Sequence, residues 1–122
     1  MVASVRTILI VDDSAFMRVI MRNILTKNGY EVVGEAENGY LGVQKYMELL
    51  PDIVTMDITM PEMDGIEALK QIINVNVGAN VLMVSSMGQG AIIREAIASG
   101  AKGFILKPYD EKQVLEVLGK LK

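Results

Sequence analysis

The hydrophobic residues of this 122-residue chain alternate between short continuous apolar runs and longer amphipathic stretches, and the pair recurs five times. Short apolar runs rich in β-branched residues are typical of strands buried on both faces, and amphipathic stretches are typical of helices that cover a sheet. The alternation therefore predicts five βα units. The predicted strands are Thr7–Val11, Glu31–Ala36, Ile53–Met56, Val81–Val84 and Phe104–Leu106.

Each predicted strand is followed by a stretch with the features of a helix. Asn28-Gly29, Pro51 and Gly100 follow three of these stretches as helix-ending residues. The last helix is predicted to open at Asp110, with Gln113 three residues on as in a capping box. The residues expected to face the sheet are, in chain order, Phe16, Val19, Ile20, Ile24, Val43, Met47, Leu50, Ile66, Leu69, Ile73, Ile92, Ala96, Ile97, Val114, Val117, Leu118 and Leu121.

These elements predict the α/β class, with a doubly wound, five-stranded parallel sheet and five helices in a single domain over residues 1–122. In open sheets of this kind, ligands bind beyond the carboxyl ends of the strands. The residues that follow the strands are therefore the candidates for function.

The composition excludes several kinds of chemistry. The chain has no Cys and no His, which rules out disulfides, zinc sites built on these residues, Cys nucleophiles and histidine bases. The net charge of −3 and a pI near 4.9 argue against binding to nucleic acid. No apolar run approaches the roughly 18 residues of a membrane span, and residues 1–7 hold no signal-peptide core, so a cytoplasmic protein is expected.

Groups suited to phosphate chemistry follow four of the five predicted strands. Asp12 and Asp13 follow the first strand, Asp57 the third, Ser85 the fourth and Lys107 the fifth. If the strands take the flavodoxin-like order 2-1-3-4-5, the first and third are neighbours and the three carboxylates share one pocket. Like charges about 5 Å apart repel by about 3 kcal/mol per pair at an effective dielectric of 20, so such a cluster takes up protons or binds a cation.

The ligand chemistry favours Mg²⁺, which prefers oxygen ligands and completes its shell with water or phosphate oxygens. Lys107 and Ser85 could then orient the oxygens of a phosphoryl group, and Asp57 could act as a nucleophile that forms an acyl phosphate. Taken one at a time, these residues have simpler interpretations. An Asp after a strand is usually a turn former or helix cap, and Ser85 or Ser86 could cap the fourth helix. Only the five together favour the functional interpretation.

Four segments of the sequence resemble the receiver domains of two-component response regulators, and together they span the chain. They are Ile8-Leu9-Ile10-Val11-Asp12-Asp13-Ser14, Met56-Asp57-Ile58-Thr59-Met60-Pro61-Glu62-Met63-Asp64-Gly65, Val84-Ser85-Ser86 and Gly103-Phe104-Ile105-Leu106-Lys107-Pro108. Three further segments resemble the stand-alone chemotaxis members of that family. These are Ala15-Phe16-Met17-Arg18, Glu35-Ala36-Glu37-Asn38-Gly39 and Ser86-Met87-Gly88-Gln89.

The resemblance implies a phosphorylation-activated chemotaxis regulator, in which Asp57 accepts a phosphoryl group from the phosphohistidine of a sensor histidine kinase. It also implies that Mg²⁺ is the cofactor, held by Asp12, Asp13, Asp57 and the backbone carbonyl of Thr59. Lys107 would contact the phosphoryl group, and the Ser85 hydroxyl would follow it. The peptide bond before Pro108 is expected to be cis.

The output implied by the resemblance is a change of shape at a distant face. Movement of Ser85 and of the Phe104 ring would remodel the face made by the fourth helix, the fifth strand and the fifth helix. That face would bind a flagellar-type motor switch or adaptor protein. The chain would be a monomer and not an enzyme with an external substrate. Thr59 and Met87 flank the attacking water by resemblance, and neither is acidic or an amide, so slow self-dephosphorylation is expected unless a phosphatase assists.

Three other functions stay open. A chain of this length leaves no room for an effector domain, but a receiver of a larger regulator or a phosphorelay intermediate would carry the same motifs. A Mg²⁺-dependent phosphohydrolase of the haloacid-dehalogenase type would use Asp57 as nucleophile, although it would carry a second Asp where Thr59 stands. A flavin-binding electron carrier shares the predicted fold, although Asp12-Asp13-Ser14-Ala15 is unlike a phosphate-binding loop.

Overall fold

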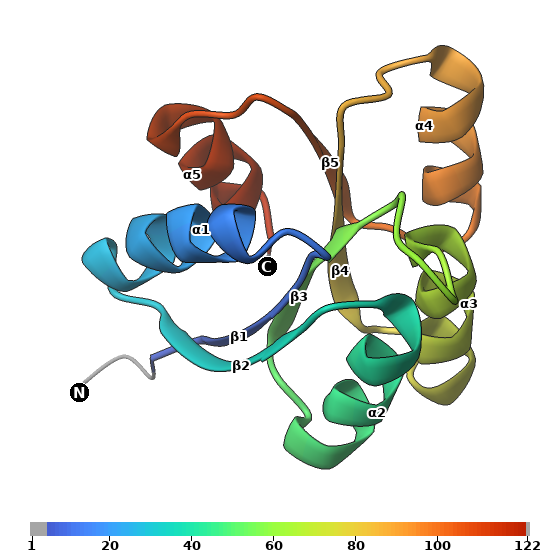
Figure 1. The fold of residues 1–122 in the computed structure, drawn as a ribbon, viewed down its shortest axis with the longest axis horizontal. Coiled ribbons are helices and arrows are strands. Elements are labelled where there is room, and N and C mark those ends of the chain that lie inside the picture. The colour runs from blue at the N-terminus through green and yellow to red at the C-terminus, as the bar shows by residue number, and fades with distance from the viewer. Residues whose placement is uncertain (1–4, 122) are drawn as a thin grey trace.

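Five parallel strands alternate with five helices along the chain (Figure 1). The computed structural model describes residues 5–121, so residues 1–4 and 122 of the predicted domain lie outside it. The elements are β1 Thr7–Val11, α1 Ala15–Lys27, β2 Glu31–Ala36, α2 Gly39–Leu49, β3 Ile53–Asp57, α3 Gly65–Val75, β4 Asn80–Ser85, α4 Gly90–Ala98, β5 Gly103–Leu106 and α5 Glu111–Gly119. The sheet order is β2-β1-β3-β4-β5, which confirms the predicted architecture and order. The predicted strands agree with these bounds to within one residue.

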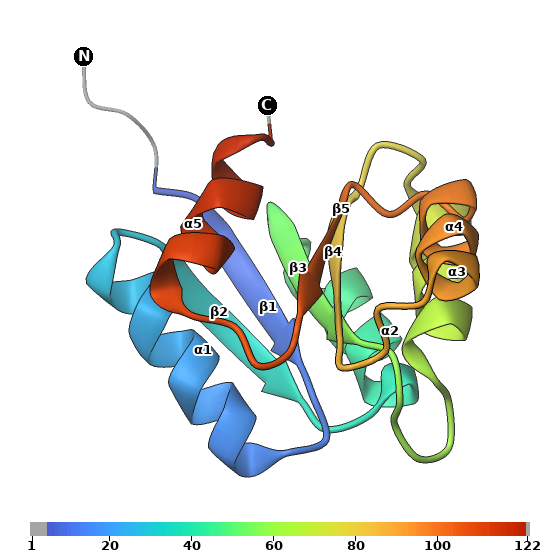
Figure 2. The same cartoon turned by 90° about the horizontal axis from the view of Figure 1, so that it is seen from above.

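The helices cover both faces of the sheet, with α1 and α5 on one face and α2, α3 and α4 on the other (Figures 1 and 2). Successive side chains of a strand point to opposite faces. Ile8 and Ile10 of β1 therefore pack with α1 and α5, whereas Leu9 and Val11 pack with the other three helices. Burial on both faces explains why β1 and β3 are largely apolar runs. Within residues 5–121, no helix is long and apolar enough to cross a lipid bilayer.

The face that the first helix turns to the sheet is only partly the one predicted, since Ile24 packs against the core as expected but other residues do not. Phe16 and Val19 are 72% and 54% exposed, so their assignment to the core was wrong. Met21 and Leu25 are buried instead and pack against Ile8 and its neighbours. The apolar residues of this helix form a broad stripe that includes both Phe16 and Met21, so periodicity alone could not choose which part of the stripe is buried.

The predicted face of the second helix is also right only in part, since Val43 packs against the core. Met47 and Leu50 are exposed, whereas Tyr46 and Gly42 are buried. A Cβ at Gly42 would lie 3.0 Å from a methyl carbon of Val11, so the missing side chain lets this helix lie close to the sheet. The apolar pattern could not show this because a glycine adds nothing to it. A glycine at such a position indicates that two backbones approach closely, and it carries no hydrophobic signal.

The predicted faces of α3 and α5 are confirmed, while that of α4 is right only in part. Ile66, Leu69, Val114 and Leu118 are buried as expected, and Ala96 of α4 is buried but Ile97 is exposed. Four helices begin with a capping side chain directly after the loop from the preceding strand. The caps are Ser14, Asn38, Asp64 and Asp110. The fourth helix follows Gln89, which makes no side-chain capping bond, so Ser85 does not cap it.

Gly65, the first residue of α3, gives a test of the close contact between this helix and the end of β3. A Cβ at this position would overlap the backbone carbonyl oxygen of Asp57. We expect Gly65→Ala to lower the free energy of unfolding by about 1–3 kcal/mol, the usual cost of overpacking. Urea unfolding followed by circular dichroism measures this. Gly119→Ala is the matched control, since nothing lies within 4 Å of its Cβ position and alanine favours a helix. Equal effects of the two substitutions would contradict the packing account.

Candidate functional site

The residues that follow the strands meet at one edge of the sheet, where the carboxyl ends of the parallel strands lie side by side (Figure 2). Asp12, Asp13 and Asp57 each place a carboxylate oxygen within 4.8 Å of the others. The Nζ atom of Lys107 lies 3.1 Å from Asp12 Oδ2 and 3.3 Å from Asp57 Oδ1. Four of the five residues singled out from the sequence therefore lie together in one cluster. They are Asp12, Asp13, Asp57 and Lys107.

Asp12 is held by hydrogen bonds of both its backbone and its side chain. Its backbone N–H donates to the carbonyl of Ala36 on β2, at 3.0 Å. Its Oδ1 atom accepts a hydrogen bond of 2.9 Å from the Ser14 N–H, and its Oδ2 accepts from Lys107. The side chain is buried, and so is that of Asp57, whereas Asp13 is exposed. The cluster therefore has two buried carboxylates and one that is exposed to solvent.

The electrostatics of the site are dominated by burial and by the surplus of carboxylates. Burial raises the pKa of Asp57 to about 6, the charge of Asp12 adds to the rise, and Lys107 opposes it. Burial alone would lower the pKa of Lys107, but its hydrogen bond to Asp12 and the charge of Asp57 outweigh this and raise it. The single ammonium is shared between two carboxylates, so it cannot neutralise the cluster.

The donor set fits a hard divalent cation. With all groups ionised, three carboxylates and one ammonium leave a net charge of −2. The donors are oxygen atoms only, which is the ligand type that Mg²⁺ prefers. A divalent cation here would neutralise the carboxylate charge that adds to the rise in the pKa of Asp57. The observed cluster thus supports the metal-binding set predicted for Asp12, Asp13 and Asp57.

The remaining predicted residues lie around this cluster. Ser85 ends β4, is 2% exposed, and its Oγ accepts a hydrogen bond of 3.0 Å from the N–H of Met87. Thr59 lies two residues beyond Asp57 in the loop before α3 and is exposed. Phe104 on β5 is half-buried against the core beneath α2, α3 and α4. These positions are compatible with the roles that the family resemblance implies, and those roles stay predictions. The peptide bond before Pro108 is cis, as expected.

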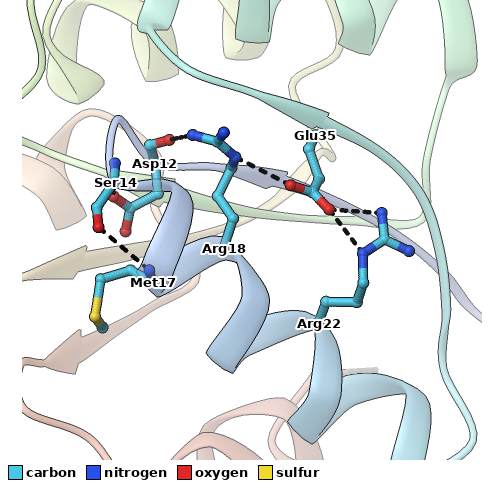
Figure 3. Close-up of polar contacts among 6 residues, drawn as sticks. All are labelled: Asp12, Ser14, Met17, Arg18, Arg22 and Glu35. Atoms are coloured by element: carbon cyan, nitrogen blue, oxygen red, sulfur yellow. Dashed lines mark hydrogen bonds and ion pairs between the residues drawn. The ribbon is translucent and has the colours of Figure 1, made fainter.

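Two features near the site were not predicted. Arg18 of α1 donates from Nη1 to the backbone carbonyl of Asp12 at 2.7 Å, and its Nε bonds to Glu35 on β2 (Figure 3). Tyr109 lies in the loop after β5, where burial, with Asp12 and Asp57 adding their negative charges, raises its pKa to about 12. The only sequence signals for the first were the pair of arginines four residues apart on α1 and the acidic Glu35 on a strand that also carries Glu31. Nothing in the sequence pointed to the second.

Comparisons with known proteins agree with this geometry. The sequence model of the response regulator receiver domain family matches residues 8–119. The chemotaxis protein CheY of Bacillus subtilis is 58% identical over 113 residues, which cover 93% of this chain and 94% of that protein. CheY of Thermotoga maritima is 55% identical over 116 residues, covering 95% and 97%. A crystal structure of a CheX–CheY complex with BeF3 and Mg²⁺ from Borrelia burgdorferi matches with a TM-score of 0.91 at 39% identity, over 93% of this chain and 86% of that one.

The raised pKa of Asp57 predicts a measurable cost to stability in the metal-free protein. A carboxyl whose folded-state pKa lies above its unfolded value destabilises the fold at neutral pH, and this penalty disappears as the pH falls through about 6 toward 4. In EDTA at pH 7.5, we expect Asp57→Asn to raise the free energy of unfolding by about 1–2 kcal/mol, with the gain shrinking below pH 6. Glu48→Gln, an exposed carboxyl on α2, is the control and should show no such pH dependence. A gain that is independent of pH would contradict this electrostatic origin.

Proposed function

The chain belongs to the response regulator receiver family, and from this premise we propose that it is a chemotaxis regulator that is switched by phosphorylation of Asp57. One observation carries the proposal. Asp57 is buried beside two further carboxylates and in contact with the ammonium of Lys107. This combination lowers the stability of the fold, but it suits a carboxylate that accepts a phosphoryl group next to a divalent cation.

In this proposal the donor is the phosphohistidine of a sensor histidine kinase. A carboxylate oxygen of Asp57 attacks phosphorus, the P–N bond breaks, and its electron pair stays on the imidazole nitrogen. Asp12, Asp13, Asp57 and the backbone carbonyl of Thr59 would hold Mg²⁺, which supplies positive charge to the phosphoryl oxygens. The Lys107 ammonium already contacts Asp57, so it is placed to balance the charge of the acyl phosphate. The Ser85 hydroxyl, now bonded to the Met87 N–H, would turn to a phosphoryl oxygen.

The output follows from the elements that carry these residues. Ser85 ends β4 and precedes the loop to α4, whose first turn lacks a side-chain cap, so a shift of Ser85 can be passed to that loop. Phe104 lies on β5 next to Met83 of β4 and would change its burial with the loop. We propose that the face made by α4, β5 and α5 then binds a flagellar-type motor switch or adaptor protein. The Borrelia complex of a similar chain with CheX, BeF3 and Mg²⁺ supports binding of Mg²⁺ and of a further protein.

The remaining parts of the proposal concern the whole chain. Residues 1–122 would form a single receiver domain that acts as a monomer in the cytoplasm. It would assist its own phosphorylation and dephosphorylation, without turning over an external substrate. The high identity to CheY proteins over nearly their full length favours this stand-alone role over a phosphorelay intermediate or a receiver within a larger regulator.

Intact-mass spectrometry with acetyl phosphate tests the phosphoacceptor directly. We expect one phosphoryl group, about 80 Da, to be added to the parent protein in the presence of Mg²⁺ and none in EDTA. Asp57→Asn should gain nothing, because the amide cannot form the acyl phosphate. Asp52→Asn is the matched control, since Asp52 bonds to Thr7 and lies at the start of β3, away from the site. Phosphorylation of the Asp57→Asn protein, or none of the parent, would overturn the proposal.

Decay of the phosphorylated protein tests the expected role of Met87. This residue follows Ser85 by two positions and offers no polar group to orient an attacking water. We expect the parent to lose its phosphoryl group slowly and Met87→Glu to lose it at least about tenfold faster, since a carboxylate can orient and activate water. Met87→Leu is the matched control for loss of the Met side chain. No acceleration in the Glu variant would show that another feature limits the reaction.

A further inference from the structure

Arg18 connects the acidic site to the neighbouring helix and strand. It lies on α1, one turn beyond Ser14, and its side chain is only 18% exposed. Its Nη1 donates to the carbonyl oxygen of Asp12 at 2.7 Å, while its Nε donates to Glu35 Oε1 at 3.0 Å (Figure 3). The guanidinium thus uses two of its edges to join the residue after β1 to a residue of β2.

Glu35 is fixed in turn by a second arginine. Its Oε2 atom accepts a hydrogen bond of 2.7 Å from Nε of Arg22, four residues along the same helix (Figure 3). Burial alone would raise the pKa of Glu35, but the hydrogen bonds from Arg22 and Arg18 outweigh it and lower the pKa, so the carboxylate stays ionised. Arg18 is therefore held in place by an ionised partner rather than free to leave the Asp12 carbonyl.

The bond to Asp12 falls on the peptide group that joins the two acidic residues after β1. The Asp12 carbonyl belongs to the peptide whose nitrogen is that of Asp13, so its orientation sets the direction in which the Asp13 side chain leaves the backbone. In the described part of the chain, no hydrogen bond or ion pair holds the Asp13 carboxylate itself, and the side chain is exposed. The orientation of this carboxylate therefore depends on its backbone.

We propose that Arg18 is a positioning residue for the cation site, because it fixes the Asp12–Asp13 peptide so that both carboxylates face Asp57. This inference rests on the proposed function, since it assumes that the three carboxylates bind Mg²⁺. Residues that orient metal ligands commonly account for a 10–100-fold share of metal affinity. Arginine suits the task because its planar fork can bond a carbonyl and a carboxylate at once, which an ammonium does less well.

The charge of Arg18 and its position have opposite expected effects on the affinity for Mg²⁺. A cationic side chain near a divalent cation repels it, so its removal should strengthen Mg²⁺ binding if charge is all that matters. If Arg18 acts by position, its removal should weaken binding. The sign of the change in affinity thus separates the two effects.

The test is isothermal titration calorimetry of MgCl2 into the metal-free protein and four variants, with thermal unfolding in EDTA as a measure of the fold. We expect Arg18→Ala to raise the dissociation constant for Mg²⁺ about tenfold or more. Arg18→Lys, which keeps the charge but not the fork, should recover part of the affinity. Glu35→Gln should weaken binding less than Arg18→Ala, since it loosens Arg18 without removing it. Arg22→Ala is the matched control, with the same loss of charge from the same helix and no bond to Asp12, and should stay within about twofold of the parent.

Each outcome has a separate meaning. If the parent does not bind Mg²⁺, the proposed function and this inference both fail. If the parent binds and Arg18→Ala binds equally or more tightly, only the inference fails. Equal weakening by Arg22→Ala would also overturn it, because the effect would then belong to the helix or its charge. Should Arg18→Ala unfold at the temperature of the titration, the Lys and Gln variants decide: unchanged affinity in both of them overturns the inference.

Discussion

The contact of one ammonium with two carboxylates is the interaction on which the site depends. Parallel strands bring Asp12 and Asp57 to the same edge of the sheet, where repulsion would drive one of them to protonate. Lys107 lies within 3.3 Å of both and reduces that repulsion without cancelling it. The cluster is thus stable enough to form and still negative enough to attract a divalent cation. A fully neutralised site would not attract a divalent cation. A site without Lys107 would destabilise the fold through repulsion between its carboxylates.

Both helical layers contribute to holding these groups in place. On the side of α1, the Ser14 N–H and Arg18 bond to Asp12, and Arg18 is anchored to β2 through Glu35. On the other side, the N–H of Gly65 donates to the carbonyl of Ile58 at 2.7 Å, which ties the residue after Asp57 to the start of α3. The site is therefore attached to the rigid elements on both faces, which fixes the positions of its charged groups.

The fold and the main site residues could be predicted because both depend on local signals. Strands buried on both faces appear in the sequence as continuous apolar runs, and the polar residues that follow four of the five strands mark the edge where ligands bind. The buried faces of α1 and α2 could not be predicted in this way. Phe16 and Met21 are equally apolar in the sequence, and only the packing geometry decides which is buried. The Arg18–Glu35 pair was missed for a similar reason, since it joins a helix to a strand 17 residues away.

The backbone of the site suggests how a change of charge at Asp57 reaches the rest of the molecule. The N–H of Lys107 donates to the carbonyl of Ser85 at 2.9 Å, so the ammonium beside Asp57 and the hydroxyl at the end of β4 belong to directly bonded residues. The N–H of Ile58 bonds to the carbonyl of Val84 at 3.1 Å, which joins the same strand to the residue after Asp57. The end of β4 is thus held from both neighbours by the groups that surround the carboxylate. The following loop has no side-chain cap at α4, so in the proposed switch a change in the hydrogen bond of Ser85 would be passed to a loop that is not fixed by a capping bond.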